Sequence, residues 1–174
     1  MGNTILAAVY GTATAGIDVT EICQSIASTG NDDIPANNTT FSDPDPGAQK
    51  SFAILYQNPA LNSGHPIALA CGEGGTIDLT PSPPTATTPV ATPGSPRFKV
   101  LHATYGTARN GFDVTPICQW LLDNGGDTIT VSNETFGGDP EHGVQKRFGI
   151  LYTHVGSETP RSLATAEGVT LKLR

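Results

Sequence analysis

Two stretches of the chain are copies of one another, and this duplication limits the possible folds more than any other feature. Residues 5–79 match residues 100–173, with about half of the aligned positions identical. The segment YGTATAGIDVTEICQ at Tyr10–Gln24, for example, matches YGTARNGFDVTPICQ at Tyr105–Gln119 without a gap. Copies this similar adopt the same fold, and about 75 residues can form one modest core. We therefore expect one small structural unit, present twice.

A proline-rich segment, TPSPPTATTPVATPGSPR at residues 80–97, separates the two copies. Its six prolines, five threonines and single charge cannot bury a core and favour an extended polyproline II chain. We expect a first β-rich repeat at residues 1–79, a Pro/Thr-rich linker at 80–97 and a second β-rich repeat at 98–174. Two units joined in this way need not share an interface, and each is expected to fold alone.

Short apolar runs rich in β-branched and aromatic residues predict strands in each copy. Ile5–Tyr10 and Ser51–Gln57 are two such runs in the first copy, and both recur in the second. Each copy is also expected to end in a closing hairpin turned at Glu-Gly: Ile67–Cys71 with Thr76–Leu79, and Arg161–Ala166 with Val169–Leu173. The predicted fold is mainly β, like a β-sandwich and mostly antiparallel, with one short helix in each of two tandem repeats.

The helix is expected directly after the Asp-Val-Thr sequence of each copy. In the second copy Thr115 suits the N-cap and Pro116 suits the first helical position. The equivalent Thr20 and the preceding Asp18 are expected to bond free N–H groups at the helix start rather than a ligand. Cys23 then lies on the buried apolar stripe, where a small hydrophobe is favoured over a nucleophile.

Charge and hydropathy exclude two classes of partner. With 9 basic against 16 acidic residues and a net charge of −7, the chain lacks the basic face that nucleic-acid binding requires. No run approaches the roughly 20 apolar residues of a membrane span, so membrane insertion is not expected. The start MGNTILAAVYGT has no basic region typical of a signal peptide. This predicts a cytoplasmic protein whose cysteines are reduced. If Met1 was added for expression, the natural protein would instead be secreted.

The charge is divided unevenly between the copies. Residues 1–79 carry one basic and eight acidic residues, whereas residues 98–174 carry seven basic and eight acidic residues. Equal folds with unequal surfaces indicate unlike partners, or one partner that contacts a single copy.

Catalysis is not expected. A site that belongs to the repeated unit should have its groups in both copies, yet none of the four histidines has a histidine at the aligned position: His65, His102, His142 and His154. The nucleophile, phosphate-loop and metalloprotease motifs are also missing from the sequence. Lys50 and Lys146, which do align, are expected to pair with a nearby carboxylate.

The loop at Asp127–Gly143, with its counterpart at Asp32–Gly47, is the strongest candidate for ligand binding. It is rich in oxygen donors that could hydrogen-bond sugar hydroxyls, and glycines let its backbone turn tightly. The candidate ligand-binding residues are Asp127, Asn133, Thr135, Asp139, Glu141, Asp32, Asn38, Thr40 and Asp43, with Trp120 on the helix flank. The same oxygens suit calcium, but EF-hand spacing is missing and a turn explains the pattern too, so no cofactor is expected.

A series of motifs runs through both copies: Tyr-Gly, Asp-Val-Thr, Asn-x-Thr-Phe, Lys-x-Phe-x-Ile-Leu-Tyr and Glu-Gly. In this the chain resembles the C-terminal domain of a mitochondrial J-protein family and modules appended to microbial proteins. The resemblance implies a β-rich module and transfers no catalytic residue. As a soluble, acidic tandem protein without a signal peptide, the chain is also similar in type to the small cytoplasmic lectins of fungal fruiting bodies.

Two hypotheses of function follow. The first is a bivalent, lectin-like carbohydrate-binding protein, with two weak sites joined by a stiff tether. The alternative is a structural or interaction module that docks a partner protein through a sheet edge or a loop. We favour the first, because a duplicated small module on a spacer increases avidity.

Overall fold

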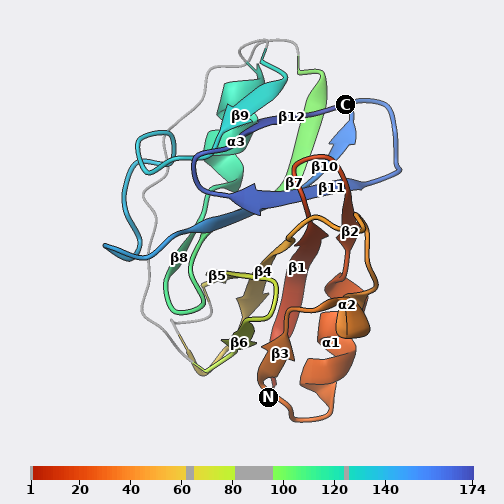
Figure 1. Ribbon diagram of the computed structural model, residues 1–174, viewed down its shortest axis with the longest axis vertical. Helices are drawn as coiled ribbons and strands as arrows, with labels where there is room; N and C mark the ends of the chain where they lie inside the picture. Colours follow the sequence, from red (N-terminus) through yellow and green to blue (C-terminus); the bar gives the residue numbers. More distant parts are fainter. Residues whose placement is uncertain (1, 62–64, 81–95, 124–125) are drawn as a thin grey trace.

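The computed structural model describes residues 2–61, 65–80, 96–123 and 126–174. Most of the predicted linker, residues 81–95, lies outside the described residues. In Figure 1 most of the first repeat, coloured red to yellow, lies in the lower half, and most of the second, green to blue, lies in the upper half. The described strands are paired antiparallel, and this confirms the predicted fold class.

The first repeat contains a four-stranded sheet in the order β2-β1-β4-β5. Its strands are β1 (Thr4–Gly11), β2 (Gly16–Asp18), β4 (Ser51–Gln57) and β5 (Ile67–Gly72). The remaining elements are α1 (Thr20–Ser28), β3 (Asp33–Pro35), the one-turn α2 (Asn38–Phe41) and β6 (Thr76–Asp78).

The second repeat has an equivalent sheet in the order β8-β7-β10-β11. Its strands are β7 (Phe98–Gly106), β8 (Gly111–Asp113), β10 (Arg147–His154) and β11 (Arg161–Ala166). The other elements are α3 (Thr115–Asp123), β9 (Thr128–Thr130) and β12 (Thr170–Lys172). None of the helices in the described parts of the chain is long and apolar enough to cross a membrane.

The predicted closing hairpin is wrong. After the Glu-Gly turn, the last strand of each repeat does not return along the strand before it. Instead β6 pairs with β3 and β12 pairs with β9, which gives each repeat a separate two-stranded sheet. The physical reason is the core: a strand that crosses to the far side covers apolar residues that a hairpin would leave exposed.

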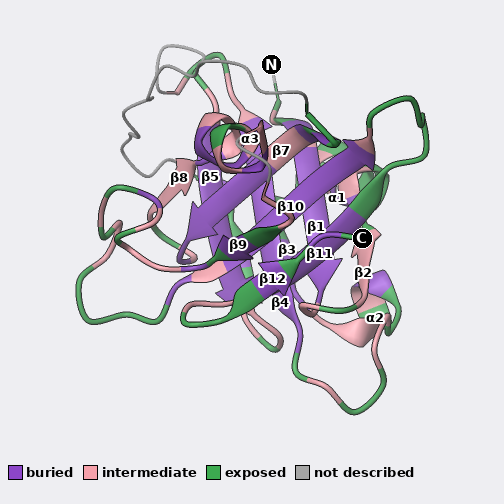
Figure 2. Cartoon of the chain, turned by 90° about the horizontal axis from the view of Figure 1, so that it is seen from above, coloured by how far each residue is buried: buried purple, intermediate pink, exposed green. Residues whose placement is uncertain are grey.

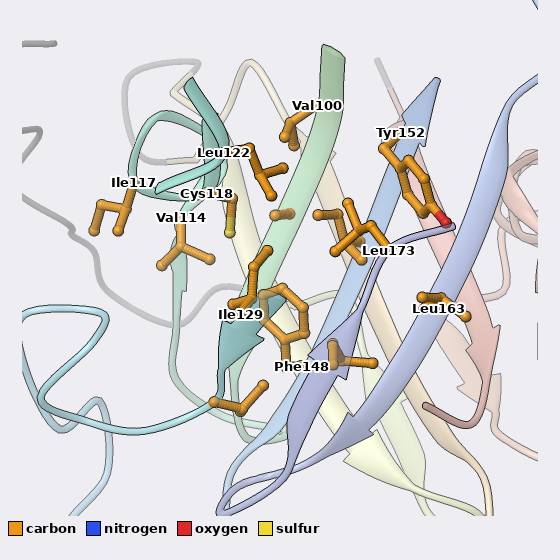
Figure 3. Packing of buried hydrophobic residues seen from close by; sticks show 14 of the residues in the cluster. Val100, Val114, Ile117, Cys118, Leu122, Ile129, Phe148, Tyr152, Leu163 and Leu173 are labelled. Carbon is orange, nitrogen blue, oxygen red and sulfur yellow. The ribbon is translucent and has the colours of Figure 1, made fainter. Parts of the chain in front are cut away.

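Each repeat buries its own core between the large sheet on one side and the helix and small sheet on the other. Figure 3 shows this arrangement in the second repeat, where Cys118 and Leu122 of α3 and Ile129 of β9 lie over Phe148 of β10. Those four residues are at most 2% exposed. In the first repeat Tyr10 and Phe41 belong to the equivalent cluster.

The two large sheets pack against each other through their other faces, so the expectation that the repeats need not share an interface is wrong. A separate apolar cluster lies between them: Ala7 and Val9 from β1, Leu151 from β10 and Ala164 from β11, with Leu101 packed against it. Gly149 approaches Ala53 so closely that a Cβ atom added to the glycine would lie 2.6 Å from the Cβ of Ala53. Figure 2 shows the buried strands of both sheets crossing in the middle of the molecule.

The edges of the two sheets are also joined. The N–H of Ala70 in β5 donates to the carbonyl of Thr107 at 2.7 Å, and the N–H of Ala164 in β11 donates to the carbonyl of Thr12 at 2.9 Å. Gly16 lies against the main chain of β11 so closely that an added Cβ would be 2.5 Å from a carbonyl oxygen. The equivalent Gly111 approaches β5 in the same way. Glycine is thus required at both hairpins, because a side chain would push the sheet edges apart.

Each helix is attached to the first strand of its repeat by a glutamine. The Oε1 atom of Gln24 accepts from the N–H of Ile5 at 2.9 Å, and its Nε2 atom donates to the carbonyl of Asn3 at 3.3 Å. Gln119 makes the equivalent pair of bonds to β7. These bonds satisfy main-chain groups that have no strand beside them.

The predicted threonine N-cap is wrong. Helix α1 begins at Thr20, its N-cap is Val19, and no side chain caps it in the manner expected. The Oγ1 atom of Thr20 instead accepts from the N–H of Ala8 at 2.9 Å, and Thr115 makes the same bond to β7. Asp18 does bond the helix start, accepting from the N–H of Thr20 at 2.9 Å, as predicted for that residue.

Candidate functional site

One buried lysine in each repeat lies inside a cluster of polar side chains. In the second repeat the Nζ atom of Lys146 is 2.7 Å from Asp139 and 3.9 Å from Glu167. The hydroxyl of Tyr105 donates to Asn133 at 2.7 Å and lies 3.0 Å from Glu167. Lys146 is 3% exposed, so its charge is balanced by carboxylates rather than by water.

The first repeat contains the same cluster. Lys50 is 2% exposed, with its Nζ atom 2.7 Å from Asp43 and 4.0 Å from Glu73. The hydroxyl of Tyr10 donates to Asn38 at 2.8 Å, and the amide of Asn38 donates to Asp43 at 3.2 Å. The predicted pairing of both lysines with carboxylates is therefore confirmed.

These clusters explain why the same polar residues recur in both copies. The hydrogen bond from Lys146 holds the pKa of Asp139 below its usual range, and Lys50 does the same for Asp43. Burial, with the nearby Glu167, raises the pKa of Tyr105 far above that of a free phenol. Each cluster thus joins a lysine, a carboxylate and a neutral phenol, and these contacts anchor the long loop to the sheet.

The remaining predicted loop residues also bond within the protein. The N–H of Thr40 donates to Asn37 at 2.9 Å, and the N–H of Thr135 donates to Ser132 at 3.1 Å, so both residues stabilise turns. Glu141 accepts from the hydroxyl of Thr107, which holds the hairpin that joins the two sheets. The hydroxyls of Thr40 and Thr135 bond the same partners, at 3.1 Å and 3.0 Å, so these side chains also have internal roles.

Three predicted residues lie apart from the clusters. Trp120 is 41% exposed on α3, and Asp127 forms an ion pair with Lys172, with Oδ2 and Nζ 3.5 Å apart. Asp32 is exposed next to Asp33 and Asp78, and one oxygen of each of these carboxylates lies within 4.8 Å of the others. Exposed acidic groups at this spacing are common without an ion, so the group does not by itself define a metal site.

The three cysteines are free and buried, which agrees with the expected reduced thiols. Burial raises the pKa of Cys23 and of Cys71 to about 12. It also raises the pKa of Cys118. A thiol so protonated at neutral pH is a poor nucleophile.

A groove of about 730 Å³ lies where the first repeat meets the second. One wall comes from the β1–β2 hairpin and β2, and the other from β11, β12 and the end of β10. Apolar, hydroxyl and cationic groups share its surface: Ala13, Ile17, Pro44, Pro160 and Leu163; Thr14, Ser162 and Thr170; Arg161, Lys172 and Arg174. A few polar groups on an apolar concave surface are typical of sites for small ligands.

Sequence reasoning did not find this groove, because its walls come from segments about 150 residues apart that only the packing of the repeats brings together. A signal was present in the sequence. Gly16 and Gly111 occur at the same position in both copies, and a glycine kept where the chain meets another backbone indicates close approach.

In comparisons with family models, curated proteins and solved structures, no significant match to the chain was found.

Proposed function

We propose that the chain is a non-enzymatic carbohydrate-binding protein and that the groove between the repeats is its principal binding site. The observation that carries this proposal is the groove itself, with the hydroxyls of Thr14 and Thr170 beside the apolar surface of Ile17 and Leu163. Sugars present hydroxyl edges and apolar faces together, and a concave surface of this mixed kind complements both.

The groove replaces the long loops as the proposed site, because its lining brings apolar and polar groups together on one concave surface. The bivalent form of the proposal changes as well. The equivalent junction, between β8 and β5, carries Phe112 and Ile67 where the groove has Ile17 and Arg161. A single groove between the repeats therefore replaces two like modules on a tether.

The packing weakens the alternative in which a partner adds a strand to a sheet edge. The outer edges of β5 and β11 already bond to the hairpins of the other repeat through Ala70 and Ala164. A partner strand would have to displace those bonds. The alternative that remains is docking of a partner protein through a loop, which predicts that the chain binds a protein and no glycan.

A glycan array with the intact chain tests the proposal. Thr170 is exposed on β12 and lines the groove, so Thr170→Trp should obstruct the groove without disturbing the core. Thr76, the aligned residue on β6, is also exposed, which makes Thr76→Trp the matched control. We expect Thr170→Trp to abolish retention of the bound glycans and Thr76→Trp to preserve it. If the unaltered chain binds no glycan on the array and binds a partner protein instead, the proposal is overturned.

A further inference from the structure

Several of the few lysines and arginines of the chain line the groove. Of the nine lysines and arginines in the chain, Arg161, Lys172 and Arg174 all line this one groove. The whole chain carries a net charge of −7, so a local cluster of positive charge is conspicuous against its surroundings. The charges that oppose the cluster are Asp18, which lines the groove, Asp45, which bonds the lining residue Thr14, and Asp127, which pairs with Lys172.

A hydrogen bond at the wall holds one of these cations, and another has an exposed ion-pair partner. The guanidinium of Arg161 donates to the main-chain oxygen of Arg174 at 2.6 Å, and the hydroxyl of Tyr152 lies 3.2 Å from the same oxygen. Among the ion pairs of the described residues, none involves Arg161 or Arg174. The side chain of Lys172 is 61% exposed, and an exposed pair such as Lys172–Asp127 contributes little, so Lys172 can exchange its partner for a ligand anion.

The aligned positions in the first repeat carry none of these charges. Ile67 aligns with Arg161, Asp78 with Lys172 and Thr80 with Arg174. The repeated fold therefore does not require cations at these positions. This difference separates the groove from the lysine clusters, which both repeats share.

We propose that the groove selects acidic oligosaccharides, in which a sulfate or carboxylate group contacts Arg161, Lys172 and Arg174 while the sugar rings occupy the apolar walls. The inference rests on the proposed function and specifies its ligand class. Guanidinium groups bind both anions through paired hydrogen bonds. An acidic peptide in extended form is disfavoured, because the edge of β11 beside the groove is bonded to Thr12 at Ala164.

Calorimetry with three matched oligosaccharides tests the inference: one neutral, one sulfated and one built from uronic acids. The variant R161Q/K172Q/R174Q removes the groove cations. The variant R97Q/K99Q/R109Q removes three exposed cations of the same half of the chain outside the groove, with the same change in net charge. All six positions are on the surface, so both variants should fold, which circular dichroism checks.

We expect the unaltered chain to bind an acidic oligosaccharide at least about tenfold more tightly than the neutral one, a difference of about 1.4 kcal/mol. The groove variant should lose this preference and the control variant should keep it. Added salt should reduce the preference in the unaltered chain. Whichever acidic probe binds more tightly identifies sulfate or carboxylate as the recognised group.

Three results would overturn the inference. Equal binding of neutral and acidic sugars would refute the acidic ligand while leaving the carbohydrate proposal standing. Inorganic sulfate binding as tightly as the sulfated sugar would show that the sugar rings contribute nothing. Binding of an acidic peptide, with no sugar bound, would refute both the ligand class and the carbohydrate proposal.

Discussion

At the scale of single residues, two buried tyrosine hydroxyls differ in whether they have hydrogen-bond partners. The hydroxyl of Tyr105 bonds Asn133 and Glu167, whereas the hydroxyl of Tyr56 is buried without a hydrogen-bond partner among the described residues. Burial raises the pKa of Tyr56 to about 12, so this hydroxyl is neutral. Its burial costs free energy because the hydroxyl loses its hydrogen bonds to water.

Replacing each tyrosine with phenylalanine should therefore have unequal effects. Tyr105→Phe should lower the free energy of unfolding by about 1–3 kcal/mol, because it removes the buried hydroxyl that Asn133 and Glu167 contact. Tyr56→Phe should be neutral or stabilising, because it removes a polar group that bonds nothing among the described residues. Urea denaturation measures both, and equal losses would show that the cluster around Lys146 contributes no stability.

Low pH should destabilise the fold by protonating the carboxylates of the clusters around Lys50 and Lys146. Lys146 lowers the pKa of Asp139 in the folded state. The Asp139 carboxylate therefore binds a proton more readily in the unfolded chain than in the folded one. The resulting stability is fully present above the ordinary carboxyl pKa of about 4 and is lost as the pH falls through the lower folded value. Urea midpoints measured downward from pH 6 should fall less steeply in Asp139→Asn than in the unaltered chain. Glu134→Gln, at an exposed position of the same loop, controls for net charge, and equal slopes in the unaltered chain and Asp139→Asn would contradict the prediction.

At the scale of elements, the attachment of the helix to the first strand depends on one side chain. Gln24→Ala leaves the N–H of Ile5, a residue only 6% exposed, without its acceptor. We expect a loss of about 1–3 kcal/mol in the free energy of unfolding. Ser25→Ala, at the next and exposed helical position, is the matched control and should change stability by less than about 0.5 kcal/mol. Similar effects of both variants in urea denaturation would show that the glutamine bonds are not needed.

The elements show where sequence reasoning succeeds. Local patterns identified the main strands and the helix, because period and composition depend on neighbours in the chain. They did not show that β6 pairs with β3 rather than β5, since both partners suit a short apolar strand. They also misjudged Thr20, whose hydroxyl bonds a strand instead of a helix end. A side chain's partner is set by tertiary packing, which a local motif does not encode.

At the scale of the whole molecule, the two repeats meet with room for one methyl group between β4 and β10. Ala53 and Gly149 occupy aligned positions in the two copies and face each other across the interface. Both copies could not carry alanine here without a clash. The apolar residues of the inner faces were visible in the sequence, but a buried strand looks the same whether a helix or a second sheet covers its other side. The interface and the groove beside it were therefore not predictable from either copy alone.

Exchanging the two residues tests this fit. Gly149→Ala alone should lower the free energy of unfolding by about 1–3 kcal/mol through overpacking. Adding Ala53→Gly should restore most of the loss, leaving the exchanged double variant within about 1 kcal/mol of the unaltered chain. A double-mutant cycle in urea measures the coupling between the two positions. Simple additivity of the two single effects would mean that the sheets do not meet at these residues.

The contacts between the sheets also have a consequence for the time course of folding. Arg147 and Ser51, which bond across the interface, are 96 residues apart in the chain. Contacts so distant form late, since a long loop must close first, and until then the inner face of the first sheet is exposed. A second chain in the same condition offers an identical surface, and exchange of halves would produce a swapped dimer with every contact of the monomer. Covalent linkage holds the matching half at an effective concentration in the millimolar range, so in dilute solution each sheet should close on its own partner.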